Sequence, residues 1–171
     1  MIPVQIDTEC GRIEIELDLE HAPVTTANFL RYVDGGNYEG GRFHRTVRLD
    51  NQPDNQVLIE VIQAGINPET APETQEAIPL ERTHATGLSH RDGVVSMARR
   101  TPDSATSDFF ICIGDQLSLD YGGDRNPDGQ GFAAFGRVIA GMDMVRAIQA
   151  APSDGQKLTP PIKILSVKRL T

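Results

Sequence analysis

Two stretches of the sequence contain residue types that could carry out chemistry. The run Asp124-Arg-Asn-Pro-Asp-Gly matches the opening of a calcium-binding loop, but its twelfth position would be Phe135 instead of the glutamate that completes such a site. Ser89, His90 and Asp92 are the residue types of a hydrolase triad, although residues this close in sequence rarely reach triad geometry. We therefore interpret the first stretch as a turn-rich surface loop, with calcium binding as the alternative, and do not expect hydrolysis.

The cysteines and histidines form neither a redox motif nor a metal motif. Cys10 and Cys112 lie far apart in strand-like runs and form no C-x-x-C pattern, so we expect two buried free thiols. The four histidines lack the spacing of zinc ligands. An activity without metal or cofactor is the expectation that follows.

The elements that would position a site follow mainly a period of two. Apolar residues alternate with polar ones on both sides of Gly11, which predicts a β-hairpin. Further strands are predicted over residues 43–47, 57–63, 94–98, 109–113, 132–138 and 162–167. Residues 65–92 are rich in Pro, Thr, Glu and Gly without a sustained period, so we expect a long ordered loop there.

Two helices are expected. The first begins near Pro23, which suits a first helical turn, and ends at Gly35. Its apolar face is predicted to consist of Val24, Ala27 and Leu30. The second covers residues 141–150. About eight strands with two distant helices predict a mainly β fold: a closed eight-stranded antiparallel β-barrel capped by two α-helices, in which closure removes the sheet edges. Without a repeat or linker, residues 1–171 are expected to form one domain.

The composition limits the classes of partner. The net charge of −8 argues against nucleic acid and anionic membranes, since both select basic surfaces. No apolar run approaches the ~20 residues of a membrane span, and the first residues lack the features of a secretory signal. We expect a cytoplasmic monomer, or a periplasmic one if an export signal was removed.

Four segments, taken together and in order, resemble the cyclophilins. They are Ala22-Pro-Val-Thr-Thr-Ala-Asn-Phe, Phe43-His-Arg, Val61-Ile-Gln-Ala-Gly, and Ser96-Met-Ala with Ser107-Asp-Phe-Phe-Ile-Cys and Phe135-Gly-Arg-Val-Ile-Ala-Gly-Met. The resemblance runs from about residue 4 to residue 168. It implies a barrel with its active site on the outer surface and peptidyl-prolyl cis-trans isomerase activity on peptides and flexible protein segments that contain proline.

The resemblance also implies the site residues. Arg45 would be the catalytic cation, because a guanidinium stays charged near neutral pH and presents a rigid fork of donors. Phe110 would form a wall of the proline pocket, since adjacent strand residues such as Phe109 and Phe110 point to opposite faces. Gln63 would hydrogen-bond the substrate backbone. The residues implied to bind substrate around them are His44, Val61, Ala98, Arg99, Asp108, Leu119 and Phe132.

The sequence departs from the family pattern at several places. Residues 48–56 form a polar insertion after Phe-His-Arg, Glu60 stands where an aromatic residue is frequent, Asp108 replaces a usual glutamine, and Phe132 stands where histidine is frequent. These changes leave a non-catalytic peptide-binding or scaffold module as the alternative function. The chain contains no tryptophan, and Ser118 lies near the position of the tryptophan that helps bind cyclosporin in the family, so we expect weak cyclosporin binding.

Overall fold

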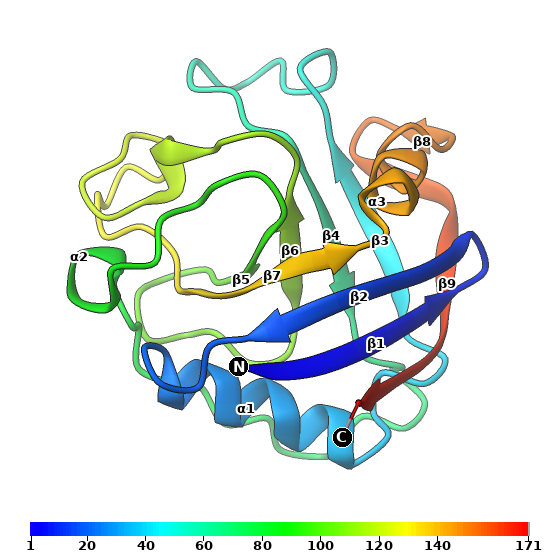
Figure 1. Ribbon diagram of the computed structural model, residues 1–171. Coiled ribbons are helices and arrows are strands. Elements are labelled where there is room, and N and C mark those ends of the chain that lie inside the picture. The colour runs from blue at the N-terminus through cyan, green and yellow to red at the C-terminus, as the bar shows by residue number, and fades with distance from the viewer. Residues whose placement is uncertain (171) are drawn as a thin grey trace.

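The sheet closes on itself. The computed structural model describes residues 1–170, and its strands run in the order β1-β2-β7-β5-β6-β4-β3-β9, with β1 and β9 paired to close the barrel (Figure 1). All pairings between these strands are antiparallel. The barrel strands are β1 (Ile2–Thr8), β2 (Gly11–Leu17), β3 (Arg42–Val47), β4 (Val61–Gly65), β5 (Val94–Met97), β6 (Phe109–Cys112), β7 (Ala134–Ala140) and β9 (Lys157–Arg169). The predicted mainly β barrel of eight antiparallel strands is confirmed.

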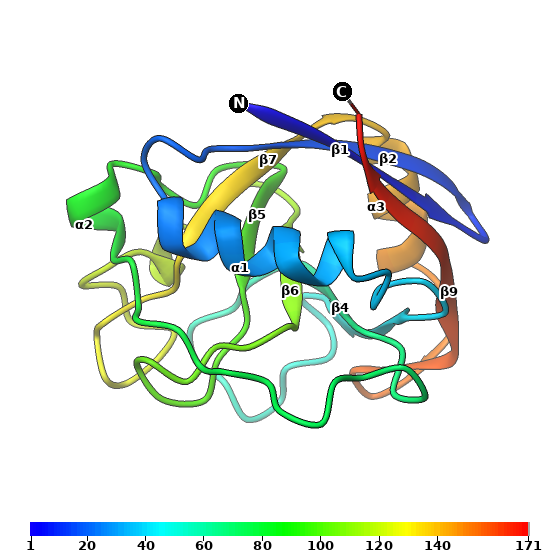
Figure 2. The ribbon, with the colours of Figure 1, turned by 90° about the horizontal axis from the view of Figure 1, so that it is seen from below.

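Three helices, and not the predicted two, accompany the barrel. The expected helices are α1 (Pro23–Asp34) and α3 (Met142–Gln149), which lie on opposite sides of it (Figures 1 and 2). The third, α2 (Thr83–Thr86), is a single turn inside the segment predicted as a loop, and a two-residue strand, β8 (Ser153–Asp154), pairs with the start of β9. None of the helices in residues 1–170 is long and apolar enough to cross a membrane.

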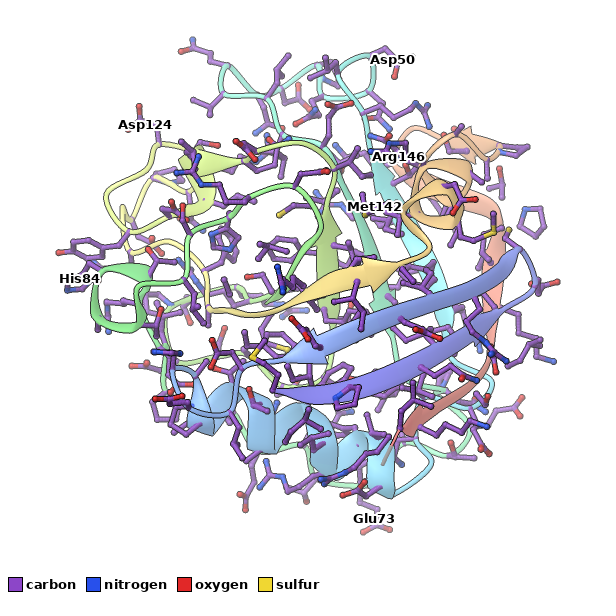
Figure 3. The ribbon with its side chains drawn as sticks, viewed as in Figure 1. Asp50, Glu73, His84, Asp124, Met142 and Arg146 are labelled. Carbon is purple, nitrogen blue, oxygen red and sulfur yellow. The ribbon has the colours of Figure 1, made fainter. Side chains whose placement is uncertain are left out.

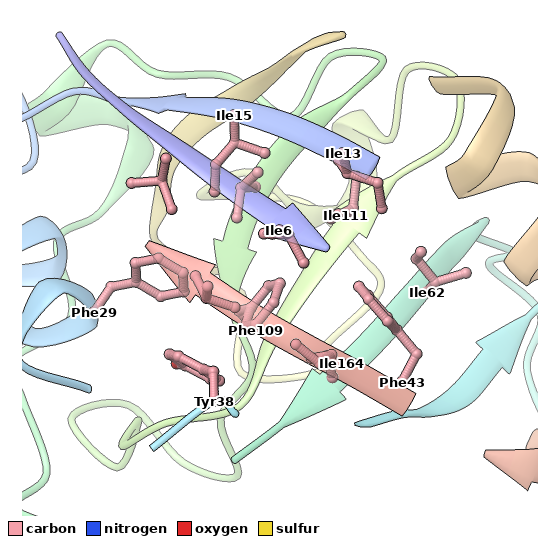
Figure 4. Packing of buried hydrophobic residues seen from close by; sticks show 14 of the residues in the cluster. Ile6, Ile13, Ile15, Phe29, Tyr38, Phe43, Ile62, Phe109, Ile111 and Ile164 are labelled. Atoms are coloured by element: carbon pink, nitrogen blue, oxygen red, sulfur yellow. The ribbon is translucent and has the colours of Figure 1, made fainter. Parts of the chain in front are cut away.

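The barrel interior is filled by one apolar cluster with aromatic rings at its centre. Phe29 of α1 packs against Phe109 edge to face at 5.3 Å, and Tyr38 and Phe43 contact the same Phe109 ring (Figure 4). A second, smaller cluster on the outer side of β4 and β6 contains Phe110. The two neighbouring phenylalanines therefore serve opposite faces of β6, as strand alternation predicts.

Two predictions of which side chains are buried are wrong. Val24 and Ala27 are exposed on α1, because the Glu81 carboxylate accepts hydrogen bonds from the backbone of Val24 and from the backbone and hydroxyl of Thr25, which turns the Thr25 side of the helix inward. Cys10 is exposed, since it lies in the turn between β1 and β2 and not in a strand, whereas Cys112 is buried as expected.

Candidate functional site

The outer apolar cluster borders a hollow of about 260 Å³. Phe110, which is only 5% exposed, forms one wall, and Phe132 packs edge-on against it at 5.7 Å. Gly131 precedes Phe132 with a φ of +72°, and its backbone approaches that of Asp120 too closely for a side chain. Val61 and Leu119 add to the apolar lining. A slot with apolar walls of this kind can accept a pyrrolidine ring. The name proline pocket is used below for this hollow.

Arg45 lies at the edge of the proline pocket and is held by two amides. Its Nη1 donates to Oε1 of Gln63 at 2.9 Å, and its Nε donates to Oε1 of Gln156 at 2.9 Å. Cross-strand pairing explains the first contact, because Arg45 and Gln63 are register partners on β3 and β4. Burial lowers the pKa of Arg45 from an ordinary value so high that the guanidinium remains charged near neutral pH. A fixed cation therefore borders the apolar slot.

Gln63 links Arg45 to a second pair of residues. Its Nε2 donates to Oδ2 of Asp108 at 2.9 Å, and Nε2 of His44 lies 2.8 Å from the same oxygen. Asp108 lines a larger neighbouring hollow of about 710 Å³, which shares Gln63, Ala98 and Arg99 with the proline pocket. His44 lies behind Asp108 and lines neither hollow.

Arg99 contributes to the pocket wall through packing. Its side chain is 1% exposed, stacks over Phe132 at 4.6 Å and donates to the carbonyl of Gly131 and the carboxylate of Asp128. The side chain thereby anchors the loop that positions Phe132. Asp128 belongs to the calcium-like motif, and its carboxylate is engaged by Arg99. Within residues 1–170, no group of three or more His, Cys, Asp or Glu residues could hold a metal ion.

His90 supports Phe110 from behind. The two rings stack at 6.1 Å with an angle of 10°, while Nδ1 of His90 lies 2.6 Å from the Asp120 carboxylate and Nε2 lies 2.9 Å from the Ser96 hydroxyl. Because a carboxylate only accepts, Nδ1 carries the proton that is donated to Asp120. Serine, histidine and aspartate thus meet, although not in the combination considered from the sequence. Ser96 is fully buried, so these contacts are structural.

Several pocket residues were not predicted from the sequence. They are Ile59, Arg125, Asn126, Pro127 and, as a partner of Arg45, Gln156. All lie outside the barrel strands: Ile59 falls in a segment that was predicted as a strand, and the others lie in loops. Asp50 and Asp124 mark the two loops that flank this side of the barrel in Figure 3. The calcium-like motif that begins at Asp124 includes Arg125, Asn126 and Pro127, but it gives no indication of a peptide-binding site.

The structure thus brings together eight of the ten predicted site residues around the proline pocket, namely Arg45, Val61, Gln63, Ala98, Arg99, Phe110, Leu119 and Phe132. Asp108 lies in the adjoining hollow, and His44 is its neighbour. An apolar slot bordered by a fixed cation and by amide groups can bind a peptide around proline without a nucleophile or a metal.

Comparison with known proteins identifies the family. The family model described as cyclophilin type peptidyl-prolyl cis-trans isomerase/CLD matches residues 3–169. A peptidyl-prolyl cis-trans isomerase from Streptomyces antibioticus is 36% identical over 99% of both chains, and one from Acinetobacter baylyi is 35% identical over 96% of this chain and 84% of its own. A solved cyclophilin type isomerase from Cryptosporidium parvum has the same fold, with a TM-score of 0.78 at 23% identity over 99% of this chain and 98% of its own. A second structure of it was determined in the presence of the dipeptide Ala-Pro. The chain therefore belongs to the cyclophilin-type peptidyl-prolyl cis-trans isomerases.

Proposed function

We propose that the chain accelerates rotation about X-Pro bonds by seating the proline ring against Phe110 and holding the Arg45 guanidinium beside the prolyl nitrogen. Peptide bonds resist rotation because the nitrogen lone pair is delocalised into the carbonyl, which gives a barrier of ~18–20 kcal/mol. In the twisted state the lone pair returns to the nitrogen. A fixed cation that donates a hydrogen bond to this nitrogen, or to the nearby carbonyl of proline itself, stabilises the twisted state more than either planar state.

The observation that supports this proposal is the state of Arg45. Its guanidinium borders the proline pocket and is fixed by neutral amides of Gln63 and Gln156, and no carboxylate among residues 1–170 forms a salt bridge with it. Exchange spectroscopy on a short Ala-Pro peptide tests it, since uncatalysed exchange takes tens of seconds or longer. Equal rates with the wild type and with a protein that lacks this guanidinium would refute the mechanism.

The alternative, a non-catalytic peptide-binding module, receives no support from the residues that suggested it. Asp108 accepts hydrogen bonds from Gln63 and His44, and Glu60 accepts one from Gln149. Neither carboxylate lines the proline pocket. Phe132 extends the apolar wall and does not block it.

Gln156 is proposed as a positioning residue for Arg45. Besides accepting from Arg45, its Nε2 donates to the carbonyl of Asn51 at 3.1 Å, which ties the guanidinium to the 48–56 segment. Replacing Gln156 by alanine is expected to lower kcat about threefold to tenfold with little change in KM, because the loss of one neutral acceptor that orients the guanidinium costs about 1 kcal/mol. Exchange spectroscopy at several peptide concentrations separates the two constants.

A Gln156→Glu variant serves as the control for this role. It keeps an acceptor for Arg45 and, like alanine, loses the donor to the carbonyl of Asn51, but it also places a carboxylate against the guanidinium and so neutralises the cation that would face the twisted imide. We expect a loss in kcat at least as large as with alanine while the melting temperature stays within a few degrees of wild type. An effect on melting temperature alone would assign Gln156 a purely structural role.

Weak binding of cyclosporin is a further expectation. Ser118 lies in the 3-10 turn Leu117–Leu119, near the position where the family has its cyclosporin-binding tryptophan. Loss of a buried aromatic contact typically costs 2 kcal/mol or more, which weakens binding at least about thirtyfold, so a dissociation constant above the nanomolar range is expected. Calorimetric titration measures it, with Ser118→Trp as the variant expected to bind more tightly. Nanomolar binding by the wild type would contradict this prediction.

A further inference from the structure

The proline pocket contains a second guanidinium, which the proposed mechanism does not use. Arg125, from the loop between the 3-10 turn and β7, lines the same hollow as Arg45 and Phe110. Its Nη1 donates to Oε1 of Gln52 at 2.8 Å and to the carbonyl of Val57 at 2.7 Å. Its Nε and Nη2 form no hydrogen bond with any described residue. One edge of the guanidinium is therefore fixed, and the other remains available to a ligand.

Neither of the two arginines is neutralised. Within residues 1–170, no carboxylate forms a salt bridge with Arg45 or Arg125, whereas Arg99 in the same wall is paired with Asp128. Burial, and after it the charge of Arg45, lower the pKa of Arg125. Two like charges share a partly buried site in a protein of net charge −8, an arrangement that costs free energy and that an anion would offset.

We propose that Arg125, together with Arg45, selects proline peptides in which the residue directly after proline carries a carboxylate, as an Asp or Glu side chain or as the chain terminus. Guanidinium groups bind carboxylates through two parallel hydrogen bonds, and Arg125 has its Nε and Nη2 available for such a pair. This inference rests on the proposed function, because the same pocket must hold the proline ring.

The position after proline follows from the path of a bound peptide. The lining shared by the two hollows, Gln63, Ala98 and Arg99, lets the chain on one side of proline run into the larger hollow. Arg125 does not line the larger hollow, so it faces the chain that leaves in the other direction. Arg45 does not line the larger hollow either, and in the proposed mechanism it donates at the prolyl nitrogen, beside the carbonyl of proline that leads to the next residue. The residue after proline is therefore the one that passes Arg125.

A purely structural role for Arg125 would not require a charged side chain. Its Nη1 ties the loop to Gln52 and Val57, and both acceptors are neutral. Gln52 already satisfies the backbone of Ile59 through its own amide, so the 48–59 segment has further support. A neutral donor could fix the loop equally well. An unpaired cation beside Arg45 would then lower the stability of the fold through charge repulsion without any compensating contact.

Exchange spectroscopy on matched peptides, capped at both ends unless a free terminus is stated, tests the proposal. Ala-Ala-Pro-Glu-Ala is compared with Ala-Ala-Pro-Gln-Ala, and Ala-Ala-Pro-Ala with a free terminus is compared with its amide. Wild-type kcat/KM is expected to be about fivefold to tenfold higher for the peptide with the carboxylate in at least one arm, a range typical of a charge-assisted hydrogen bond discounted for partial exposure. The arm that responds identifies the source of the carboxylate.

Two variants test whether Arg125 causes the preference for the peptide with the carboxylate. Arg125→Gln is expected to bring the ratio between charged and neutral peptides close to 1, while Arg137→Gln, which removes the same charge on the exposed face of β7, leaves the ratio unchanged. Equal wild-type rates in both arms, or a ratio that survives Arg125→Gln, would overturn the proposal. A preference only for Ala-Glu-Pro-Ala-Ala, with glutamate before proline, would overturn the assigned direction.

A measurement on the wild type alone covers the case in which Arg125→Gln fails to fold. The ratio must fall toward 1 as sodium chloride screens the pocket charges, and a salt-independent ratio would contradict an ionic contact. The neutral glutamine peptide keeps this test separate from the proposed function. If it is isomerised in an Arg45-dependent way while the ratios are 1, only the role of Arg125 fails; if Arg45→Ala isomerises it as fast as wild type, the proposed mechanism fails.

Discussion

Replacing Arg45 by alanine is expected to reduce kcat/KM for a neutral Ala-Pro peptide about a hundredfold to a thousandfold, the usual cost of removing a preorganised donor from the transition state. Arg45→Lys should fall between wild type and alanine. It keeps the charge, but an ammonium cannot bond Gln63, Gln156 and the substrate at once in the planar geometry of a guanidinium. Exchange spectroscopy gives the rates, and thermal unfolding verifies that each variant is folded.

Arg42→Ala is the matched control for this experiment. Arg42 lies on the same strand, β3, and its removal changes the net charge by the same amount, but it does not line the proline pocket. It should retain the wild-type rate. A lysine variant as active as wild type would show that charge alone suffices, and the role assigned to the fork of donors would be wrong.

The barrel could be predicted because its signals are local. Alternation along β1 and β2 places apolar residues on one face, β5 and β6 are short apolar runs typical of buried strands, and the number of such strands favours a closed barrel. The alternation also separates Phe109 in the core from Phe110 in the pocket. Register then brings Arg45, Gln63 and Phe110 side by side, since Gln63 pairs with both of the others.

The remaining features could not be predicted, since they depend on contacts between distant segments. The strand predicted over 57–63 begins only at Val61, because the backbone of Ile59 is bonded by the Gln52 side chain and the carbonyl of Val57 by Arg125. Side chains thus replace strand pairing on this segment. The same holds for Gln156, which reaches Arg45 from 111 residues away. No periodicity or motif marks such residues.

Asp120→Asn is expected to have the largest effect on stability among the variants of the site. The carboxylate accepts hydrogen bonds from the Ser89 hydroxyl, the backbone nitrogen of His90 and the His90 ring, and so holds the ring that stacks on Phe110. An asparagine can keep both His90 contacts at its single amide oxygen, but its NH2 group faces the Ser89 hydroxyl, which must turn from donating to accepting, and all three hydrogen bonds lose their charged acceptor. We expect a loss of about 2–4 kcal/mol at pH 7, or a melting temperature lower by roughly 5–15 °C.

The pH dependence distinguishes a lost carboxylate from a simple packing defect. Burial raises the pKa of Asp120, but the hydrogen bonds from His90 and Ser89 outweigh it and hold the pKa below the ordinary value of 3.8. A carboxyl with a lowered folded-state pKa stabilises the fold above its unfolded pKa, and this contribution is lost as the pH falls through the folded one. The gap between wild type and Asp120→Asn should therefore be constant near neutral pH and narrow below about pH 4.

Thermal unfolding from pH 7 to pH 3 measures this gap, with Asp54→Asn as the control. Asp54 is exposed and forms no side-chain hydrogen bond within the described chain, so its variant should follow the wild-type curve throughout. A gap between wild type and Asp120→Asn that stays the same down to pH 3 would mean that shape and packing, and not the carboxylate charge, hold His90 against Phe110. The pocket wall would then be insensitive to acid, and isomerase activity on a neutral peptide would persist wherever the barrel remains folded.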